Sequence, residues 1–455
     1  MSTDKTKRAI QHLKELSYLP FTAEQIEFIY DSASFKQRII ELIRQAESRI
    51  YITALYWQND EAGQQILNEI YCAKQKKPAL DVKILVDWHR AQRNLLGAEK
   101  TKTNSDWYND ERLKNEDLKF DSMFFGVPVN TREVFGVLHI KGFVFDNTVL
   151  YSGASINNVY LNQLNKYRYD RYHLINNSEL ADSLVNFIQH HLLAENVVLP
   201  LDVTNRPKTK EIRQSIRTFR KNLATKGQYK LQNTVSFKEE LSISPLFGLG
   251  NSRNILNRTI KDLFRIVEKN LVICTPYFNF PRSLQLEIQS LLKKGKQIEI
   301  IVGDKVANDF YIPPSQPFKI AGALPYLYEH NLRLFSQKFE QYIKNGQLMV
   351  RTWKDGENSY HLKGIWVDDT YILLTGNNLN PRAWWLDAEN GLLICDPKRE
   401  LLAQFHKELD YIRRHTQILK HYSEVEDINQ YPLPVQKLLK KFARLKADKL
   451  VKMIL

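Results

Sequence analysis

Cysteine is scarce in this sequence, and long apolar runs are missing from it. Three cysteines occur among 455 residues, widely spaced and set among apolar neighbours. An odd number at such spacing argues against a disulfide framework or a zinc site, so we expect Cys72, Cys274 and Cys395 to be buried free thiols. No run of 18 apolar residues is present, and the first eight residues lack the apolar core of a signal peptide. We therefore expect a cytoplasmic protein.

Acidic residues are outnumbered, with 51 Asp and Glu against 65 Lys and Arg, which gives a formal net charge of +14. This excess favours a polyanionic partner, either a nucleic acid or an acidic lipid surface, and charge alone does not distinguish the two. Apolar residues make up 43% and charged residues 25% of the chain, which is typical of a folded globular protein rather than a disordered or fibrous one. The length favours two domains.

The two halves of the sequence repeat one order of predicted elements at an offset of about 220 residues, which indicates an internal duplication. In each half a predicted helix with an apolar stripe precedes a β-rich run, which is RIYITALYW (49–57) or NLVICTPYF (270–278). Ser34 is the predicted N-cap of the first of these helices. A second striped helix then leads to DVKILVD (81–87) or QIEIIVGD (297–304). The stripes are Phe35, Ile39, Ile40, Ile43, Ile66, Ile70 and Ala73 in the first half, and Leu256, Ile260, Leu263, Phe264, Val267, Leu284, Ile288 and Leu291 in the second. Strands that alternate with helices predict an α/β fold with a mostly parallel sheet covered on both faces.

Each half then contains the motif H-x-K-x4-D in a predicted hairpin. The copies are His139, Lys141 and Asp146, and His361, Lys363 and Asp368. Residues two apart on an extended strand face the same side, so the imidazole and the ammonium group of each copy meet at one pocket. A single copy would also fit a buried structural histidine, but two copies at equivalent repeat positions favour catalysis.

A short turn rich in small and amide residues follows each motif. Its candidate phosphate-binding residues are Ser155 and Asn157 in the first half and Asn378 and Asn380 in the second. Hydroxyl and amide groups in such a turn can donate to a bound anion. Because Gly and Asn are ordinary turn residues, a plain turn explains the pattern equally well.

The paired motifs resemble those of the phospholipase D superfamily. The runs VDWHRAQ, YSGAS, KYRYDRYHLI, CTPYFN, ANDFYIP, GALPYLYE, YHLKG and TGNNLNPRAW also resemble bacterial type II phosphatidylserine synthases over nearly the whole chain. The resemblance implies two phospholipase D-like α/β/α domains related by internal duplication, with one active site between them. We expect the first domain at 1–204, a basic linker at 205–235, the second domain at 236–430 and a basic amphipathic C-terminal helix at 431–455.

The resemblance also implies a reaction: the phosphatidyl group of CDP-diacylglycerol passes to L-serine through a phosphatidyl-histidine. One histidine would attack phosphorus and the other would protonate the leaving CMP. By analogy with the family we favour His139 as the nucleophile and His361 as the acid. Lys141 and Lys363 would neutralise the phosphoryl oxygens, so we expect neither a metal nor another cofactor.

Four carboxylates are candidates for supporting roles. Asp170 and Glu389 lie at matching places downstream of each motif, where similar enzymes place an acid that orients a histidine. Asp146 and Asp368 belong to the catalytic motifs. We expect them to hold the hairpins together, because an aspartate seven residues past the histidine faces the opposite side of a continuous strand.

A soluble enzyme with a two-chain lipid substrate must dock on a membrane, and we expect it at the cytoplasmic face of the inner membrane. Residues 431–455 carry seven Lys or Arg against one Asp, and an apolar helical face suits an anionic bilayer surface. That face comprises Val435, Leu438, Leu439, Phe442 and Leu445. The alternative is a terminal helix packed on the second domain. The aromatic insertion at 310–328 is a second candidate membrane contact, a wall of the acyl-chain pocket, or a buried domain interface.

Several other functions share these features. A nuclease of the superfamily would show both motifs and a basic surface, and a phospholipase would use water in place of serine. Cardiolipin synthases usually carry N-terminal transmembrane segments, which this sequence lacks. A non-catalytic nucleic-acid-binding protein would explain the charge but not two intact motifs. In the enzyme, the same charge predicts incidental binding to RNA or ribosomes at low salt.

Overall fold

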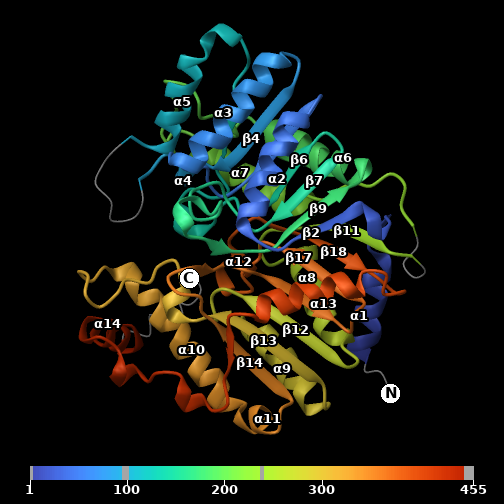
Figure 1. The fold of residues 1–455 in the computed structure, drawn as a ribbon, viewed down its shortest axis with the longest axis vertical. Helices are drawn as coiled ribbons and strands as arrows, with labels where there is room; N and C mark the ends of the chain where they lie inside the picture. The colour runs from blue at the N-terminus through green and yellow to red at the C-terminus, as the bar shows by residue number, and fades with distance from the viewer. Residues whose placement is uncertain (1–3, 95–101, 236–239, 445–455) are drawn as a thin grey trace.

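Two large β-sheets, one mainly from each half of the chain, form the frame of the protein (Figure 1). The computed structural model describes residues 4–94, 102–235 and 240–444. Helices cover the outer face of each sheet, and a central core between the sheets combines buried side chains from both halves. The predicted α/β architecture in two halves is therefore confirmed.

The first sheet contains β2 (Ile26–Ile29), β3 (Arg49–Thr53), β4 (Asp81–Asp87), β5 (Phe124–Val127), β6 (Gly142–Phe145), β7 (Thr148–Ser152), β9 (Tyr172–Asn176) and β10 (Leu199–Pro200). Their spatial order is β10-β5-β4-β3-β6-β7-β9-β2. The second sheet contains β1 (Leu19–Pro20), β11 (Ser242–Gly248), β12 (Asn270–Thr275), β13 (Gln297–Gly303), β14 (Leu348–Trp353), β16 (Gly364–Val367), β17 (Tyr371–Thr375), β18 (Glu389–Cys395) and β19 (Thr416–Ile418). Their order is β1-β11-β18-β17-β16-β12-β13-β14-β19, and β8 (Arg168–Tyr169) pairs with β15 (Ser359–Tyr360) in a small third sheet.

Both large sheets are mixed, so the expectation of a mostly parallel sheet is wrong. The strands β3, β4 and β5 run parallel, as do β12, β13 and β14. The remaining pairings in these two sheets are antiparallel. The physical reason is that tight turns join β6 to β7 and β16 to β17, and a hairpin connection imposes antiparallel pairing.

The helices bury the apolar stripes that the sequence predicts. They are α1 (Asp4–Glu15), α2 (Ser32–Gln45), α3 (Glu61–Lys76), α4 (Trp88–Ala91), α5 (Asn104–Lys114), α6 (Ser178–Phe187), α7 (Arg213–Lys226), α8 (Ile255–Ile266), α9 (Arg282–Lys293), α10 (Leu324–Lys338), α11 (Glu340–Lys344), α12 (Pro381–Trp385), α13 (Leu402–Arg413) and α14 (Leu433–Arg444). The stripes of α2 and α3 pack on the first sheet, and those of α8 and α9 pack on the second. Helix and sheet therefore stabilise each other by removing one apolar face of each from water.

Two local expectations are wrong. The N-cap of α2 is Asp31, whose carboxylate accepts the backbone N–H of Ser34 at 2.8 Å, so Ser34 lies inside the helix. The aspartate begins the helix three residues earlier, because its carboxylate caps one of the free N–H groups of the first turn. Cys72 is exposed on α3, away from the buried stripe, whereas Cys274 and Cys395 are buried as expected.

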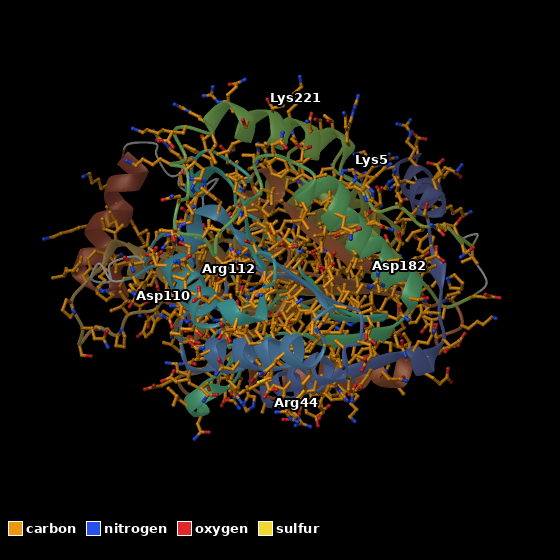
Figure 2. All side chains as sticks on the ribbon, turned by 90° about the horizontal axis from the view of Figure 1, so that it is seen from above. Lys5, Arg44, Asp110, Arg112, Asp182 and Lys221 are labelled. Atoms are coloured by element: carbon orange, nitrogen blue, oxygen red, sulfur yellow. The ribbon has the colours of Figure 1, made fainter. Side chains whose placement is uncertain are left out.

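Segments of the two halves interlock beyond the sheet frame. The N-terminal helix α1 packs on α8 of the second half, where Nδ1 of His12 lies 2.8 Å from a carboxylate oxygen of Asp262. The basic segment between the halves contains α7, which buries one apolar face. From α7, Arg220 donates to the carbonyl oxygens of Val129 and Leu386 and so joins both halves. Lys221 lies on the outer side of this helix (Figure 2).

A buried ion pair also joins the halves. Arg171 of the first half donates two hydrogen bonds to Glu408 of α13, at 2.9 and 2.7 Å, and stacks over the Trp366 ring. Burial raises the pKa of Glu408, but Arg171 and His173 more than offset this effect and lower the pKa to about 2. The pair is therefore charged at neutral pH, with both partners removed from water.

We expect Glu408→Gln to lower the free energy of unfolding by about 3–5 kcal/mol, because the change leaves the Arg171 guanidinium buried without a counter-charge. Urea unfolding at pH 7 measures the loss. The folded-state pKa of Glu408 lies below its unfolded value, so the contribution is present above the unfolded pKa. It should disappear as the pH falls from about 4 toward about 2.

The matched control is Glu41→Gln, which removes a partly exposed carboxylate paired with Arg38. It should cost at most about 1 kcal/mol. Equal losses of unfolding free energy in the two variants would show that the buried pair stabilises the fold no more than an exposed pair does.

Candidate active site

The first motif histidine is placed by a backbone pairing between the halves. Leu138 forms a parallel β-bridge with Ala388. The backbone N–H of His139 donates to the Ala388 carbonyl at 2.9 Å, and the Ala388 N–H donates to the Val137 carbonyl at 3.0 Å. Because Glu389 is the next residue after Ala388, this pairing brings its carboxylate beside the His139 ring.

The second motif histidine is placed in the same way, with the halves exchanged. The strand β8 of the first half pairs in parallel with β15 of the second. The backbone N–H of His361 donates to the Tyr169 carbonyl at 2.8 Å. Asp170 follows Tyr169 and therefore lies beside the His361 ring.

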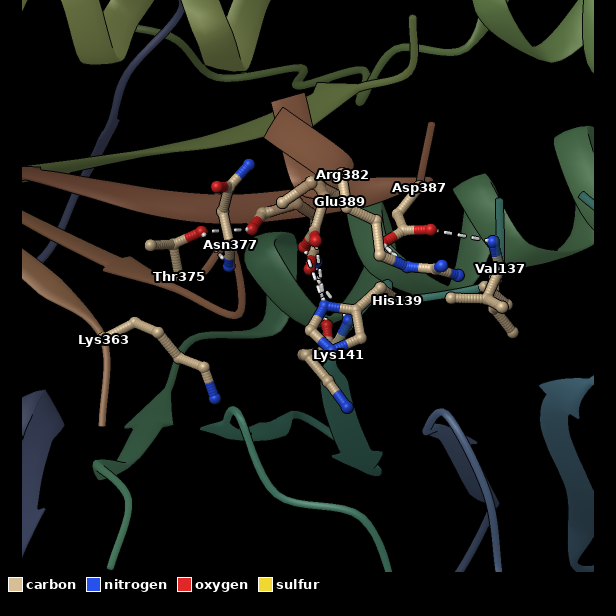
Figure 3. A network of polar contacts seen from close by, with 12 residues as sticks. Val137, His139, Lys141, Lys363, Thr375, Asn377, Arg382, Asp387 and Glu389 are labelled. Atoms are coloured by element: carbon tan, nitrogen blue, oxygen red, sulfur yellow. Dashed lines mark hydrogen bonds and ion pairs between the residues drawn. The ribbon is translucent and has the colours of Figure 1, made fainter. Parts of the chain in front are cut away.

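Each histidine consequently meets a carboxylate from the other half. Nδ1 of His139 lies 3.0 Å from Oε2 of Glu389, and Nδ1 of His361 lies 2.9 Å from Oδ2 of Asp170. Figure 3 shows the first of these contacts. An Nδ1–H held by a carboxylate leaves the lone pair of Nε2 available for chemistry. The structure thus places the candidate orienting acids at the two rings, in a crossed pattern.

Both motif lysines lie buried at the same site. Figure 3 shows the Lys141 side chain below the His139 ring and the Lys363 side chain to the left of it. Burial, together with repulsion from Lys363, lowers the pKa of Lys141 to about 7. Burial also lowers the pKa of Lys363, to about 8, against the attraction of Asp170. A phosphate group bound beside these lysines would favour the protonated form of both.

The histidines are held in their neutral form in the free protein. Burial is the main cause that lowers the pKa of His139 and His361 well below the usual value, and the motif lysines add to it. Burial raises the pKa of Asp170 and, more strongly, that of Glu389. A neutral imidazole is the form that a nucleophile requires.

The two motif aspartates lie in the hairpin turns, where each ties down the start of a neighbouring strand. Asp146 accepts backbone N–H groups of residues 47, 48 and 49, and Asp368 accepts those of residues 268, 269 and 270. Both have positive φ, 48° and 52°, a conformation that aspartate tolerates better than most residues. Their contacts favour a structural role in the motif.

The four candidate phosphate-binding residues lie in the turns after β7 and β17. Ser155 is buried, and Asn157 accepts the Tyr160 backbone N–H at 3.0 Å. Asn380 is the N-cap of α12 and accepts the Ala383 N–H at 2.9 Å. Oδ1 of Asn378 is buried without a hydrogen-bond partner among the described residues. The capping contacts show that two of these amides shape the turns, whereas contact with phosphate stays a prediction.

A cavity of about 140 Å³ lies beneath α10, at the carboxyl ends of β12 and β13. Its lining includes Lys305, Tyr328 and Glu329, but none of the motif histidines or lysines. The chemistry therefore centres on the junction of the halves rather than on this cavity. Within the described ranges, no cluster of His, Cys, Asp and Glu has the arrangement of a metal site.

Comparisons with known proteins agree with this geometry. A family model described as "Cardiolipin synthase, PLD-like domain" matches residues 260–413. The chain is 69% identical to CDP-diacylglycerol–serine O-phosphatidyltransferase of Haemophilus influenzae and 50% identical to that of Escherichia coli, over 100% of each chain.

This chain belongs to the CDP-diacylglycerol–serine O-phosphatidyltransferase family.

A solved member of the family has the same fold. The crystal structure of phosphatidylserine synthase from Haemophilus influenzae matches with a TM-score of 0.97 at 68% identity, over 100% of both chains.

Sequence reasoning missed several residues of this transferase site. Asn390 bonds the backbone of Lys141 in both directions, at 2.8 Å each, and so fixes the lysine. The Tyr160 hydroxyl lies 2.9 Å from Nδ1 of His361. Arg168 and Asp309 lie near it, inside the runs KYRYDRYHLI and ANDFYIP. These runs carried the family resemblance, but nothing in their local pattern showed that they meet in space.

We expect Asp170→Asn and Glu389→Gln each to reduce phosphatidylserine formation by about 10²- to 10⁴-fold, because an amide cannot hold the same histidine tautomer or stabilise the imidazolium. The initial rate with CDP-diacylglycerol and L-serine measures the effect, with circular dichroism to confirm folding. Asp182→Asn, which removes a partly exposed partner of Arg49, is the control and should retain activity. Near-normal rates in either carboxylate variant would exclude an orienting role for that residue.

Proposed function

We propose that this transferase makes phosphatidylserine and CMP through a covalent phosphatidyl-histidine, using one histidine from each half. The observation that supports this proposal best is the crossed pair of histidine–carboxylate contacts around two buried lysines. Two relatives that match over the whole chain are named for transfer from CDP-diacylglycerol to serine, which supports these two substrates.

In the first step, Nε2 of His139 attacks the phosphorus that carries diacylglycerol. The bond from that phosphorus to the CMP oxygen breaks. His361, which takes up a proton when the anionic substrate binds beside it, gives this proton to CMP. Glu389 is the hydrogen-bonding partner of the His139 ring among the described residues, and it engages Nδ1, which leaves Nε2 toward the site. His361 instead contacts Asp170, Tyr160 and Lys363. This difference favours His139 as the nucleophile.

One charge beside His361, the carboxylate of Asp309, favours this histidine as the acid. Burial and the cations Lys363 and Arg168 lower its pKa, whereas Asp309 raises it. A carboxylate that stabilises the imidazolium helps His361 to carry the proton that CMP needs.

In the second step, His361 takes the proton of the serine hydroxyl as its oxygen attacks phosphorus. The phosphorus–nitrogen bond breaks and His139 is released neutral. Two in-line displacements give net retention at phosphorus. Lys141 and Lys363 would neutralise charge on the phosphoryl oxygens in both steps, since an anion in a buried site favours the protonated form of each lysine.

We also propose that the enzyme docks on an anionic membrane, on its cytoplasmic face, through η7 (Ile320–Ala323) and α14. No helix among the described residues is long and apolar enough to span a bilayer. The described part of α14 packs on α10 through Val435 and Leu439, as the alternative predicted; Leu445 and the Phe442 side chain lie outside the described part. Ile320 is 72% and Leu433 68% exposed beside this contact, a combination that suits the headgroup boundary.

His139→Ala and His361→Ala should both abolish phosphatidylserine synthesis from radiolabelled CDP-diacylglycerol and L-serine in anionic mixed micelles. His361→Ala should still accumulate acid-labile radiolabel on the protein with a leaving group better than CMP, because His139 remains. His139→Ala should accumulate none. Phosphatidic acid alone from the wild-type chain, or label on the protein in His139→Ala, would contradict the proposal.

Replacing the exposed Lys437, Lys440 and Lys441 of α14 by Gln should weaken binding to phosphatidylglycerol vesicles by on the order of 100-fold, at about 1 kcal/mol per cation. Flotation at physiological ionic strength measures the binding. The control replaces the exposed Lys5, Lys7 and Lys14 of α1, which lies on the other side of the second half (Figure 1). Equal losses in both triple variants would point to net charge rather than to a docking surface.

A further inference from the structure

An arginine and an aspartate outside the catalytic motifs form a mostly buried pair across the junction of the halves. Arg168 lies in β8, two residues before Asp170, and Asp309 follows η6 (Lys305–Ala307) at the carboxyl end of β13. Their side chains are 14% and 18% exposed, and Nη1 of Arg168 lies 3.6 Å from Oδ2 of Asp309. This separation is longer than a hydrogen bond, so the two side chains form an ion pair without a direct hydrogen bond.

Each partner is held in place by a further contact. Nε of Arg168 donates to the Ser359 hydroxyl at 3.2 Å, and the guanidinium stacks over the Tyr160 ring at 4.9 Å. The Tyr277 hydroxyl donates to Oδ1 of Asp309 at 2.7 Å. A guanidinium has five N–H donors and a carboxylate has about four acceptor positions, so both groups keep capacity for a ligand.

The pair lies beside the histidine that we assign as acid and base. Tyr160 contacts Nδ1 of His361, and the Tyr277 ring lies 6.0 Å from the His361 ring. Burial would raise the pKa of Asp309, but Arg168 and His361 more than offset this effect, so the pKa is lowered and the carboxylate is charged. The site thus presents one fixed cation and one fixed anion, with tyrosine rings beside them.

Serine carries the complementary charges. Its carboxylate and ammonium group are attached to one carbon, and its hydroxyl is one bond further away. A guanidinium binds a carboxylate through paired N–H groups, and a carboxylate beside aromatic rings suits an ammonium group. A phosphatidyl acceptor that lacks one of these charges would leave either Arg168 or Asp309 without its counter-charge. A polar site rejects an analogue in this way.

We propose that Arg168 and Asp309 form the serine subsite, in which Arg168 binds the α-carboxylate and Asp309 binds the α-ammonium group while the hydroxyl faces His361. This inference rests on the proposed function and names the acceptor-selecting residues of the same site. CMP leaves from the side at which serine attacks, so Arg168 also lies within the region of the CMP phosphate. Asp309 is therefore the residue whose effect on KM should be specific to serine.

The test separates serine binding from phosphatidyl transfer. Exchange of radiolabelled CMP into CDP-diacylglycerol needs the first step and its reversal but no serine. We expect Asp309→Asn to raise the KM for L-serine by about 30-fold or more, since it unpairs a desolvated charge. CMP exchange depends on Asp309 only through the pKa of His361, so its rate should fall by a clearly smaller factor. The variant should also lose its preference for serine over glycerate, which has a hydroxyl in place of the ammonium group.

Arg168→Lys should raise the serine KM as well and reduce the preference for serine over ethanolamine, which lacks the carboxylate. The matched controls are Asp110→Asn and Arg44→Lys, which alter exposed ion pairs far from the motifs in sequence and should leave the serine KM unchanged. Tyr277→Phe removes the hydroxyl that holds Asp309 but keeps the ring. It should raise the serine KM by about 2- to 10-fold without affecting exchange.

Three outcomes would overturn the inference: an unchanged serine KM in Asp309→Asn, an equal fall of exchange and synthesis in that variant, or an unchanged preference for serine over glycerate. If Asp309→Asn does not fold, as judged by its thermal transition, an unchanged serine KM in Tyr277→Phe overturns it instead. A wild-type chain that neither exchanges CMP nor forms phosphatidylserine would refute the proposed function rather than the subsite alone.

Discussion

The active site depends on two backbone pairings that join the halves of the chain. Residues 137–139 pair with Ala388, and β8 pairs with β15. Each pairing sets a carboxylate of one half against a histidine of the other. Neither half alone can orient its own motif histidine through these contacts, so the chemistry exists only when the two halves are docked. The interface is therefore part of the active site and not merely a seam between domains.

The same arrangement explains why charged groups are tolerated so deep in the protein. Buried ions are costly unless they are paired and hydrogen-bonded. Here Lys141 and Lys363 lie close to Asp170 and Glu389, and their attraction and repulsion appear in the pKa shifts of all four groups. The lysine pKa values, about 7 and about 8, fall near neutral pH because burial opposes the charged form of both, and Lys363 further lowers the pKa of Lys141. A phosphate group restores the balance, so the free site is already organised for an anion.

Much of this site could be predicted from sequence because the duplication repeats its signal. The helical stripes, the motif pair and the positions of Asp170 and Glu389 are local patterns, and the second copy supports the first. The crossing of the carboxylates is not local, since it depends on which strand of one half pairs with which segment of the other. The mixed sheets and the Asp31 cap were missed for a related reason: tight turns and a competing capping residue decided them, rather than the period of the apolar residues.

A duplicated site must also lose its symmetry before its two histidines can take fixed, different roles. Two identical histidines would compete for the roles of nucleophile and acid. The second half supplies Arg382 near His139, where it lowers the pKa of the ring, and Asp309 near His361, where it raises it. These two residues lie outside the repeated motif. The two motifs are alike, but their surroundings are not. The residues around the motifs can therefore make one histidine the nucleophile at phosphorus and the other the proton donor.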